Sequence, residues 1–158
     1  MTIAHQIYMN TAEPVGEVAA MVSRILAAAR LCEGFPAVEA LMDRSGVPTT
    51  HGMTVRVSKP SPAPFDIIED EFGIPSKILI WLEPDKDEEF ADQDEDVVVL
   101  VAGILEETSA DVVLIHNYET VWLIRRGGEL ILHERPTLWP DRRLALIKGE
   151  YRRESLRL

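Results

Sequence analysis

The stretch from Asp111 to Glu134 reads DVVLIHNYETVWLIRRGGELILHE and carries the strongest fold signal in the chain. Polar or glycine residues separate three short apolar runs, at 112–115, 121–124 and 130–132. Short runs rich in Val, Ile, Leu and Trp between turn residues are typical of β-strands. The first gap is Asn117–Thr120, and the second is the pair Gly127-Gly128, in which both residues can adopt a positive φ without steric cost. The stretch therefore predicts a three-stranded antiparallel meander.

A two-residue turn at Gly127-Gly128 fixes the register of the second and third strands by simple counting. The predicted pairs are Arg126 with Glu129, Ile124 with Ile131 and Trp122 with His133 on one face, and Arg125 with Leu130 and Leu123 with Leu132 on the other. Both faces carry large apolar residues in the middle of the ribbon. This pattern predicts inner strands that are covered on both sides.

The rest of the chain predicts further strands and helices around this meander. We expect strands at 3–9, 53–57 and 77–82. We expect helices at 14–32, with Thr11 as a candidate N-cap, and at 97–105 and 140–147. The sequence is ambiguous between helix and strand at 37–43, predicts an extended connection at 59–64 and is irregular at 66–72. The predicted fold class is α+β, a mainly antiparallel sheet with the C-terminal three-stranded meander, packed against two main helices.

The length and composition fit one α+β domain over residues 1–158. Hydrophobic residues make up 46% of the chain, enough for a packed core. The single cysteine, Cys32, excludes an internal disulfide and lies in an apolar helical run, which favours a buried hydrophobe over a nucleophile. The N-terminus shows no signal peptide, and no apolar run approaches the ~20 residues of a membrane helix. We therefore expect a soluble cytoplasmic protein that does not bind a membrane.

The formal net charge of −11 is distributed unevenly along the chain. Residues 1–96 contain 18 acidic and 7 basic residues (−11), whereas residues 97–158 contain 9 of each and sum to zero. Nucleic-acid binding requires Lys and Arg side chains that neutralise phosphates, so this charge argues against a nucleic-acid partner. A basic protein partner would be attracted.

No catalytic or metal-binding motif is present in the sequence. The four histidines, His5, His51, His116 and His133, show neither HxH nor HExxH spacing, and with one cysteine they predict no zinc site. GxSxG, Walker-type and GxGxxG patterns are absent, and the Gly127-Gly128 turn lies between strands rather than at a helix start. We therefore predict a protein that is not an enzyme and has no cofactor. A general-acid pair of His116 and His133 across the meander is the alternative.

The segment before the second long helix is strongly acidic. It contains Glu83, Asp85, Asp87, Glu88, Glu89, Asp92, Asp94, Glu95 and Asp96, with Lys86 as its only cation. Three interpretations are open: a solvated loop that aids solubility, a protein-recognition surface, and a calcium site. Calcium is disfavoured because the segment lacks the glycine and the terminal Glu spacing of an EF-hand loop. Carboxylates this close together repel one another, and a cationic partner would relieve the repulsion.

The order of these elements in the C-terminal part of the chain is similar to that of a known family. The matching residues are Glu71-Phe72-Gly73, the strand Lys77–Leu82, the acidic segment, the apolar helix, Val112–Asn117, Leu123–Leu130, Leu138-Trp139-Pro140 and Arg143-Leu144. This pattern resembles the Sit-type (swarming-inhibition) immunity proteins of bacterial toxin/immunity systems, with weaker similarity in the first strand and helix. This chain has His116 where the family usually has Phe. The resemblance implies a small α+β cytoplasmic protein that binds and neutralises a cognate toxin, and it assigns no role to any single residue.

Charge and resemblance together predict a partner-binding surface for a basic protein toxin. We expect it to comprise Asp85, Asp87, Glu88, Glu89, Asp92, Asp94 and Tyr118. Two other classes remain open. An adaptor or self-assembling protein would associate through an exposed sheet edge, and a small enzyme would use the His116 and His133 region. The sequence leaves monomer and homodimer undecided.

Overall fold

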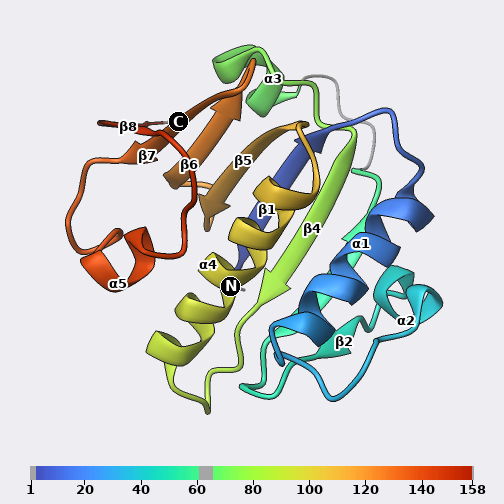
Figure 1. The fold of residues 1–158 in the computed structure, drawn as a ribbon. Coiled ribbons are helices and arrows are strands. Elements are labelled where there is room, and N and C mark those ends of the chain that lie inside the picture. Colours follow the sequence, from blue (N-terminus) through green and yellow to red (C-terminus); the bar gives the residue numbers. More distant parts are fainter. Residues whose placement is uncertain (1–2, 61–65, 158) are drawn as a thin grey trace.

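A computed structural model of the chain describes residues 3–60 and 66–157. Its strands form one eight-stranded sheet in the order β2-β3-β4-β1-β5-β6-β7-β8 (Figure 1). The strands are β1 (His5–Asn10), β2 (Val47–Pro48), β3 (Thr54–Ser58), β4 (Ile78–Glu83), β5 (Asp111–His116), β6 (Thr120–Arg126), β7 (Glu129–His133) and β8 (Arg152–Glu154). The helices are α1 (Val15–Ala28), α2 (Val38–Met42), α3 (Ile67–Phe72), α4 (Phe90–Glu107) and α5 (Asp141–Leu144). The predicted α+β class with a mainly antiparallel sheet is confirmed.

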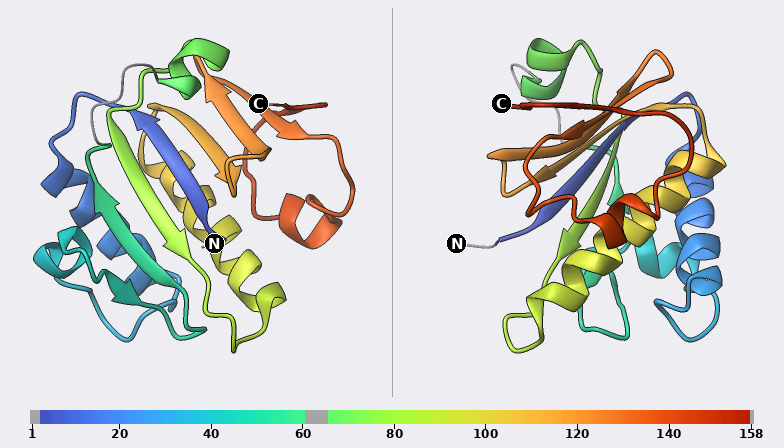
Figure 2. Two further views of the ribbon diagram at one scale, coloured as in Figure 1. Left: turned by 180° about the vertical axis from the view of Figure 1, so that it is seen from behind. Right: turned by 60° about the vertical axis from the view of Figure 1, so that its left-hand side comes forward.

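The two long helices, α1 and α4, lie on one face of the sheet, and the short helix α3 lies on the other (Figure 2). The main core fills the space between the sheet and the long helices, with apolar side chains of every strand from β3 to β7. A smaller cluster lies beneath α3, where Ile68 and Ile74 pack against β5, β6 and β7. The inner strands of the meander are therefore covered on both faces, as predicted.

The meander itself is confirmed as β5, β6 and β7. The β6–β7 turn is formed by Gly127 (φ 60°) and Gly128 (φ 81°), so both residues occupy the left-handed region that a tight two-residue hairpin turn requires. The structure has four of the predicted pairs: Arg126 with Glu129, Arg125 with Leu130, Ile124 with Ile131 and Leu123 with Leu132. Arg125 also donates hydrogen bonds to the carbonyl oxygens of Leu105, Thr108 and Ala110, which fixes the C-terminus of α4 to the sheet.

The sequence prediction placed Trp122 on the same face of the meander as Ile124, and this prediction is wrong. Across β5 and β6, Leu114 pairs with Leu123 but Ile115 pairs with Val121, so Trp122 is an extra residue in a β-bulge. The bulge breaks the alternation of side chains along β6. Trp122 consequently packs in the main core with Leu123, whereas Ile124 lies in the cluster under α3. The ladder between β6 and β7 ends at Leu123–Leu132, short of the predicted Trp122–His133 pair.

The second long helix starts seven residues earlier than predicted, at Phe90 instead of Val97. Several carboxylates of the acidic segment therefore belong to the helix, where negative charge near the N-terminus is favourable. Residues Val97, Val98, Leu100, Val101 and Ile104 form its buried face. The burial of this face outweighs the poor helix propensity of three consecutive valines.

Several smaller predictions also need correction. The segment at 66–72 is helical, because the Asp66 carboxylate accepts hydrogen bonds from the backbone N–H groups of Ile68 (3.0 Å) and Glu69 (3.2 Å), and Gly73 closes the helix at φ 69°. Helix α1 ends at Ala28, before Cys32, and Pro14 rather than Thr11 is its N-cap residue.

The structure also assigns the segments whose secondary structure the sequence left ambiguous or did not predict. The ambiguous stretch at 37–43 is helix α2, and the helix expected at 140–147 is shortened to α5. The C-terminal tail contributes the short strand β8, which pairs with β7 in parallel. Most of the extended connection predicted at 59–64 falls outside the described residues.

Candidate partner-binding surface

The end of β4 and the start of α4 are joined by a loop that carries an exposed group of carboxylates. Five of the predicted binding residues are exposed here: Asp85, Asp87, Glu88, Glu89 and Asp92. We call these five residues the acidic end. Within the part of the chain that the structure describes, none of them forms a salt bridge. Phe90 lies among them with 50% of its surface exposed.

The buried side chain of Gln93 holds this loop in place. Its Oε1 accepts a hydrogen bond from the backbone N–H of Asp85 (2.6 Å), and its Nε2 donates to the carbonyl oxygen of Asp85 (3.0 Å). The Asp85 carboxylate in turn accepts from the backbone N–H of Asp87 (2.9 Å). On the other side, a Cβ added at Gly52 would lie 2.9 Å from Cγ of Glu88, so a glycine there allows the two loops to meet. The carboxylates are therefore fixed on a braced loop.

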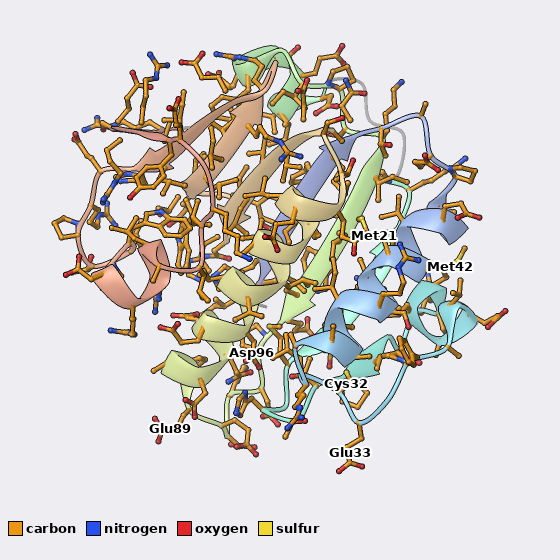
Figure 3. The ribbon with its side chains drawn as sticks, in the orientation of Figure 1. Met21, Cys32, Glu33, Met42, Glu89 and Asp96 are labelled. Carbon is orange, nitrogen blue, oxygen red and sulfur yellow. The ribbon has the colours of Figure 1, made fainter. Side chains whose placement is uncertain are left out.

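Two neighbouring loops extend the surface. The backbone N–H of Thr50 donates to the carbonyl oxygen of Leu31 (2.8 Å), which joins the 49–52 loop to the segment after α1. Glu33 and Glu89 lie at the same end of the molecule (Figure 3). Phe35, in the same segment as Glu33, is 74% exposed. Two exposed phenylalanines thus lie close in sequence to these carboxylates, Phe90 directly after Glu89 and Phe35 two residues after Glu33, and the sequence prediction did not include either of them.

The last three carboxylates of the acidic segment are partly or fully buried, and two of them, Glu95 and Asp96, are hydrogen-bonded within the fold. Asp96 is only 3% exposed, and its Oδ2 lies 2.8 Å from Nδ1 of His51. Glu95 accepts hydrogen bonds from Nε of Arg142 (2.8 Å) and of Arg143 (2.9 Å). Asp94, one of the predicted binding residues, is half-buried, with Oδ1 3.8 Å from Nε2 of His5.

Burial and these hydrogen bonds shift the pKa values of the groups involved. Burial raises the pKa of Asp96, although the hydrogen bond from His51 opposes the shift, and the same hydrogen bond raises the pKa of His51. Burial also raises the pKa of Asp94 and lowers the pKa of His5 to about 3, so His5 is neutral at physiological pH. In Glu95 burial is outweighed by the hydrogen bonds from the two arginines, and its pKa is lowered.

Tyr118, the seventh predicted residue, lies away from the helical side of the molecule. It is 52% exposed in the β5–β6 turn, and its ring centroid is 6.5 Å from that of Trp81 in β4. Sequence reasoning missed Trp81, because its strand was interpreted only as an inner strand. The exposed Phe90 had a signal in the sequence, an aromatic residue within a run of carboxylates.

The proposed pairing of His116 with His133 is not what the structure has. The ring of His116 lies against His5, with centroids 4.4 Å apart, and against Trp122. His133 instead accepts a hydrogen bond at Nδ1 from the backbone N–H of Arg135 (3.0 Å). Among the described residues, no group of three or more His, Cys, Asp and Glu side chains is arranged to hold a metal ion.

Cys32 is half-buried, and its Sγ lies 3.7 Å from the carbonyl oxygen of Pro48. Burial raises the pKa of this thiol, which disfavours the reactive thiolate form. No helix in the described part of the chain has the length and apolar character needed to cross a membrane.

Comparison with protein families gives a match over nearly the whole chain. A family model described as SitI3-like matches residues 3–143. The match includes the N-terminal strand and helix and therefore extends well beyond the C-terminal part on which the sequence resemblance was based. No curated protein and no solved structure gives a significant match.

Proposed function

Because the chain belongs to the SitI3-like family, we propose that it is a cytoplasmic immunity protein that binds and neutralises a cognate basic toxin. The acidic end is the observation that carries this proposal. Its five carboxylates are exposed and have no salt-bridge partner among the described residues; four lie on the braced loop and Asp92 lies in the first turn of α4. Side-by-side negative charges repel one another, and a basic surface brought against them would relieve that repulsion.

The two exposed phenylalanines support a protein partner in particular. A charged surface alone gives fast association, whereas large apolar side chains buried at an interface provide most of the affinity. Phe90 lies within the acidic end, and Phe35 follows Glu33 by two residues in the segment after α1. Carboxylates around apolar anchors are the arrangement expected for a surface that attracts a basic protein and then binds it.

The sheet edges favour this function over self-assembly. An adaptor that associates through an exposed edge needs a strand long enough to template pairing. Here the two edge strands are short, with β2 limited to Val47–Pro48 and β8 to Arg152–Glu154, and β2 also contains a proline. Binding rather than catalysis is likewise supported by the histidines, because His116 stacks on His5 while His133 bonds to the backbone.

The proposal predicts that the adjacent reading frame encodes a secreted protein with a toxic C-terminal domain, and the test is to measure binding between this protein and that domain. In the variant Asp85→Asn/Asp87→Asn/Glu88→Gln/Glu89→Gln the net charge falls from −11 to −7 (−11 + 4). We expect its association rate at low salt to fall about tenfold and the salt dependence of that rate to flatten. Protection of cells that express the toxin should weaken in parallel.

A matched control removes the same number of carboxylates elsewhere. Glu13, Glu71, Glu134 and Glu150 are exposed and outside the acidic end. Their replacement by Gln also gives a net charge of −7 and should leave the association rate close to that of the wild type. Equal effects of the two quadruple variants would mean that only overall charge matters. Unchanged association and protection in the first variant would refute the role of the acidic end.

A further inference from the structure

Over β3, β4 and the first half of β1, no helix in the described part of the chain covers the sheet face opposite α1 and α4, and Tyr8 of β1 lies at the margin of the cluster under α3. In the view from behind, these strands lie in front with α1 and α4 on their far side (Figure 2, left). Strand pairing places Arg56 opposite Trp81 and Trp81 opposite Gln6, and the next row contains Leu79 and Tyr8. We call these five residues the open face. They alternate with residues such as Val55, Ile80 and Ile7, which belong to the core beneath the helices.

The composition of the open face is unusual for a sheet surface in contact with water. Such a surface normally carries polar residues, whereas this one has half-buried Trp81, Leu79 and Tyr8. The guanidinium carbon of Arg56 lies 5.6 Å from the Trp81 ring centroid, and this cation–π contact holds the indole in place. Trp, Tyr and Arg are the residues most often found at the energetic centre of protein interfaces.

Next to these aromatic side chains lies a buried polar group. Gln6 is 0% exposed, and among the residues that the structure describes neither its Oε1 nor its Nε2 has a hydrogen-bond partner. Buried amides are nearly always hydrogen-bonded, and leaving both ends unpaired is costly. An asparagine or glutamine side chain offers one acceptor and a donor side by side. A second amide, in a peptide bond or a carboxamide side chain, could hydrogen-bond to both the acceptor and the donor of Gln6.

Tyr118 lies beside the aromatic side chains that flank this amide. Its ring is next to Trp81, and it is also adjacent to Tyr8, whose pKa is raised by burial and by Tyr118. Gln6 is opposite Trp81 and two residues before Tyr8 on the same strand, so Tyr118 is next to both neighbours of Gln6 on this face. Tyr118 has φ 60°, a left-handed conformation that is unfavourable for a side chain with a Cβ, and its ring is half exposed. The side chain that borders Trp81 and Tyr8 is thus a surface tyrosine on a strained turn.

The open face is continuous with the acidic end. Glu83 follows Trp81 by two residues on the same face of β4, and the chain then enters the loop that carries Asp85. A partner attracted by the acidic end would therefore reach Trp81 and Tyr118 without leaving the surface. The charge at this margin is negative, which again fits a basic partner.

We propose that the open face is the anchoring part of the toxin interface, where a loop of the basic toxin displaces Tyr118 and places an amide group on Gln6. The inference rests on the proposed function. It assigns different kinetic roles to the two surfaces. The acidic end accelerates association, whereas Trp81, Tyr118 and Gln6 slow dissociation.

The decisive variant is Gln6→Leu, which keeps the size of the side chain and removes the unpaired amide. In the free protein, its melting temperature should be equal to or above that of the wild type, because a buried unsatisfied group is lost. In the complex with the toxin domain, the amide pairing disappears, and dissociation should be about tenfold faster. A purely structural role for Gln6 would not give a more stable protein that binds more weakly.

Trp81→Ala and Tyr118→Ala provide a second measurement, with Tyr151→Ala as the matched control. Tyr151 is a similarly exposed tyrosine next to β8, at the opposite edge of the sheet. The first two variants should dissociate at least about tenfold faster with a nearly unchanged association rate, and the control should match the wild type. Their folding is checked by circular dichroism.

The outcomes separate the inference from the proposed function. Wild-type dissociation rates in Gln6→Leu, Trp81→Ala and Tyr118→Ala, together with slow association in the acidic-end variant, would refute the inference and leave the function intact. No complex between the wild-type protein and the toxin domain would overturn both. A wild-type dimer in light scattering that Trp81→Ala converts to a monomer would show a second copy as the occupant and would also refute the inference.

Discussion

Replacing Gly103 by Ala should destabilise the protein, although alanine is the better helix former. Gly103 lies in α4 where it meets α1, and a Cβ built there would be 2.6 Å from Cγ2 of Ile25. Ordinary contacts begin at 3.4 Å, so one group must move by 0.8 Å (3.4 − 2.6). Ile25 is buried and β-branched in a helix, where a single χ1 rotamer is strongly preferred, so the strain falls on the packing of the helices.

The size of the effect follows from two opposing contributions. Overpacking of a tight core lowers the free energy of unfolding by about 1–3 kcal/mol. The change from Gly to Ala within a helix raises it by about 1 kcal/mol. The expected net loss is about 1 kcal/mol, which corresponds to a fall in melting temperature of roughly 2–4 °C for a chain of this size. Scanning calorimetry or thermal circular dichroism would measure it directly.

Two further variants test whether contact with Ile25 causes the loss of stability in Gly103→Ala. At Gly16, also helical, an added Cβ meets nothing within 4 Å, so Gly16→Ala should raise the melting temperature. In an Ile25→Ala background the clashing atoms are gone, and Gly103→Ala should become stabilising, with a coupling free energy of about 1–3 kcal/mol in the double-mutant cycle. Additive effects of Gly103→Ala and Ile25→Ala, or a higher melting temperature for Gly103→Ala alone, would contradict the predicted clash.

Two other predictions concern charged groups that brace the fold. His51 has a pKa raised by its hydrogen bond to Asp96, so protonated His51 contributes stability that is complete below its unfolded pKa of 6.5 and is lost as pH rises through the folded value. Asp96→Asn should return the His51 pKa, followed by NMR, towards 6.5; an unchanged titration would contradict the pairing. Asp66 caps α3 and also accepts a hydrogen bond from the backbone N–H of Ser76 (2.9 Å). Asp66→Ala should lower the free energy of unfolding by about 1–2 kcal/mol in denaturant titrations, whereas a loss near zero would show that the cap contributes nothing.

The candidate surface could be predicted in part from the sequence. The run of carboxylates identified the acidic end, because Lys86 is the only cation among nine acidic residues there. The sequence could not separate Asp87, which is exposed, from Asp96, which is buried against His51, because their partners are decided by long-range contacts. The open face was missed for the same reason. Whether Trp81 lies beneath a helix or in an uncovered part of the sheet depends on where α1, α3 and α4 pack.

By itself the sequence determined the local features of this protein. The Gly127-Gly128 turn and the register of Leu123 with Leu132 follow from the turn geometry of adjacent residues, and the structure agrees with both. Tertiary structure decided the bulge at Trp122, which turns its indole into the main core. It also decided that Gln6 is buried, without a hydrogen-bond partner in the described part of the chain, as a result of packing among β4, β1 and β5. Local backbone preferences act over a few residues, whereas burial depends on which distant segments meet.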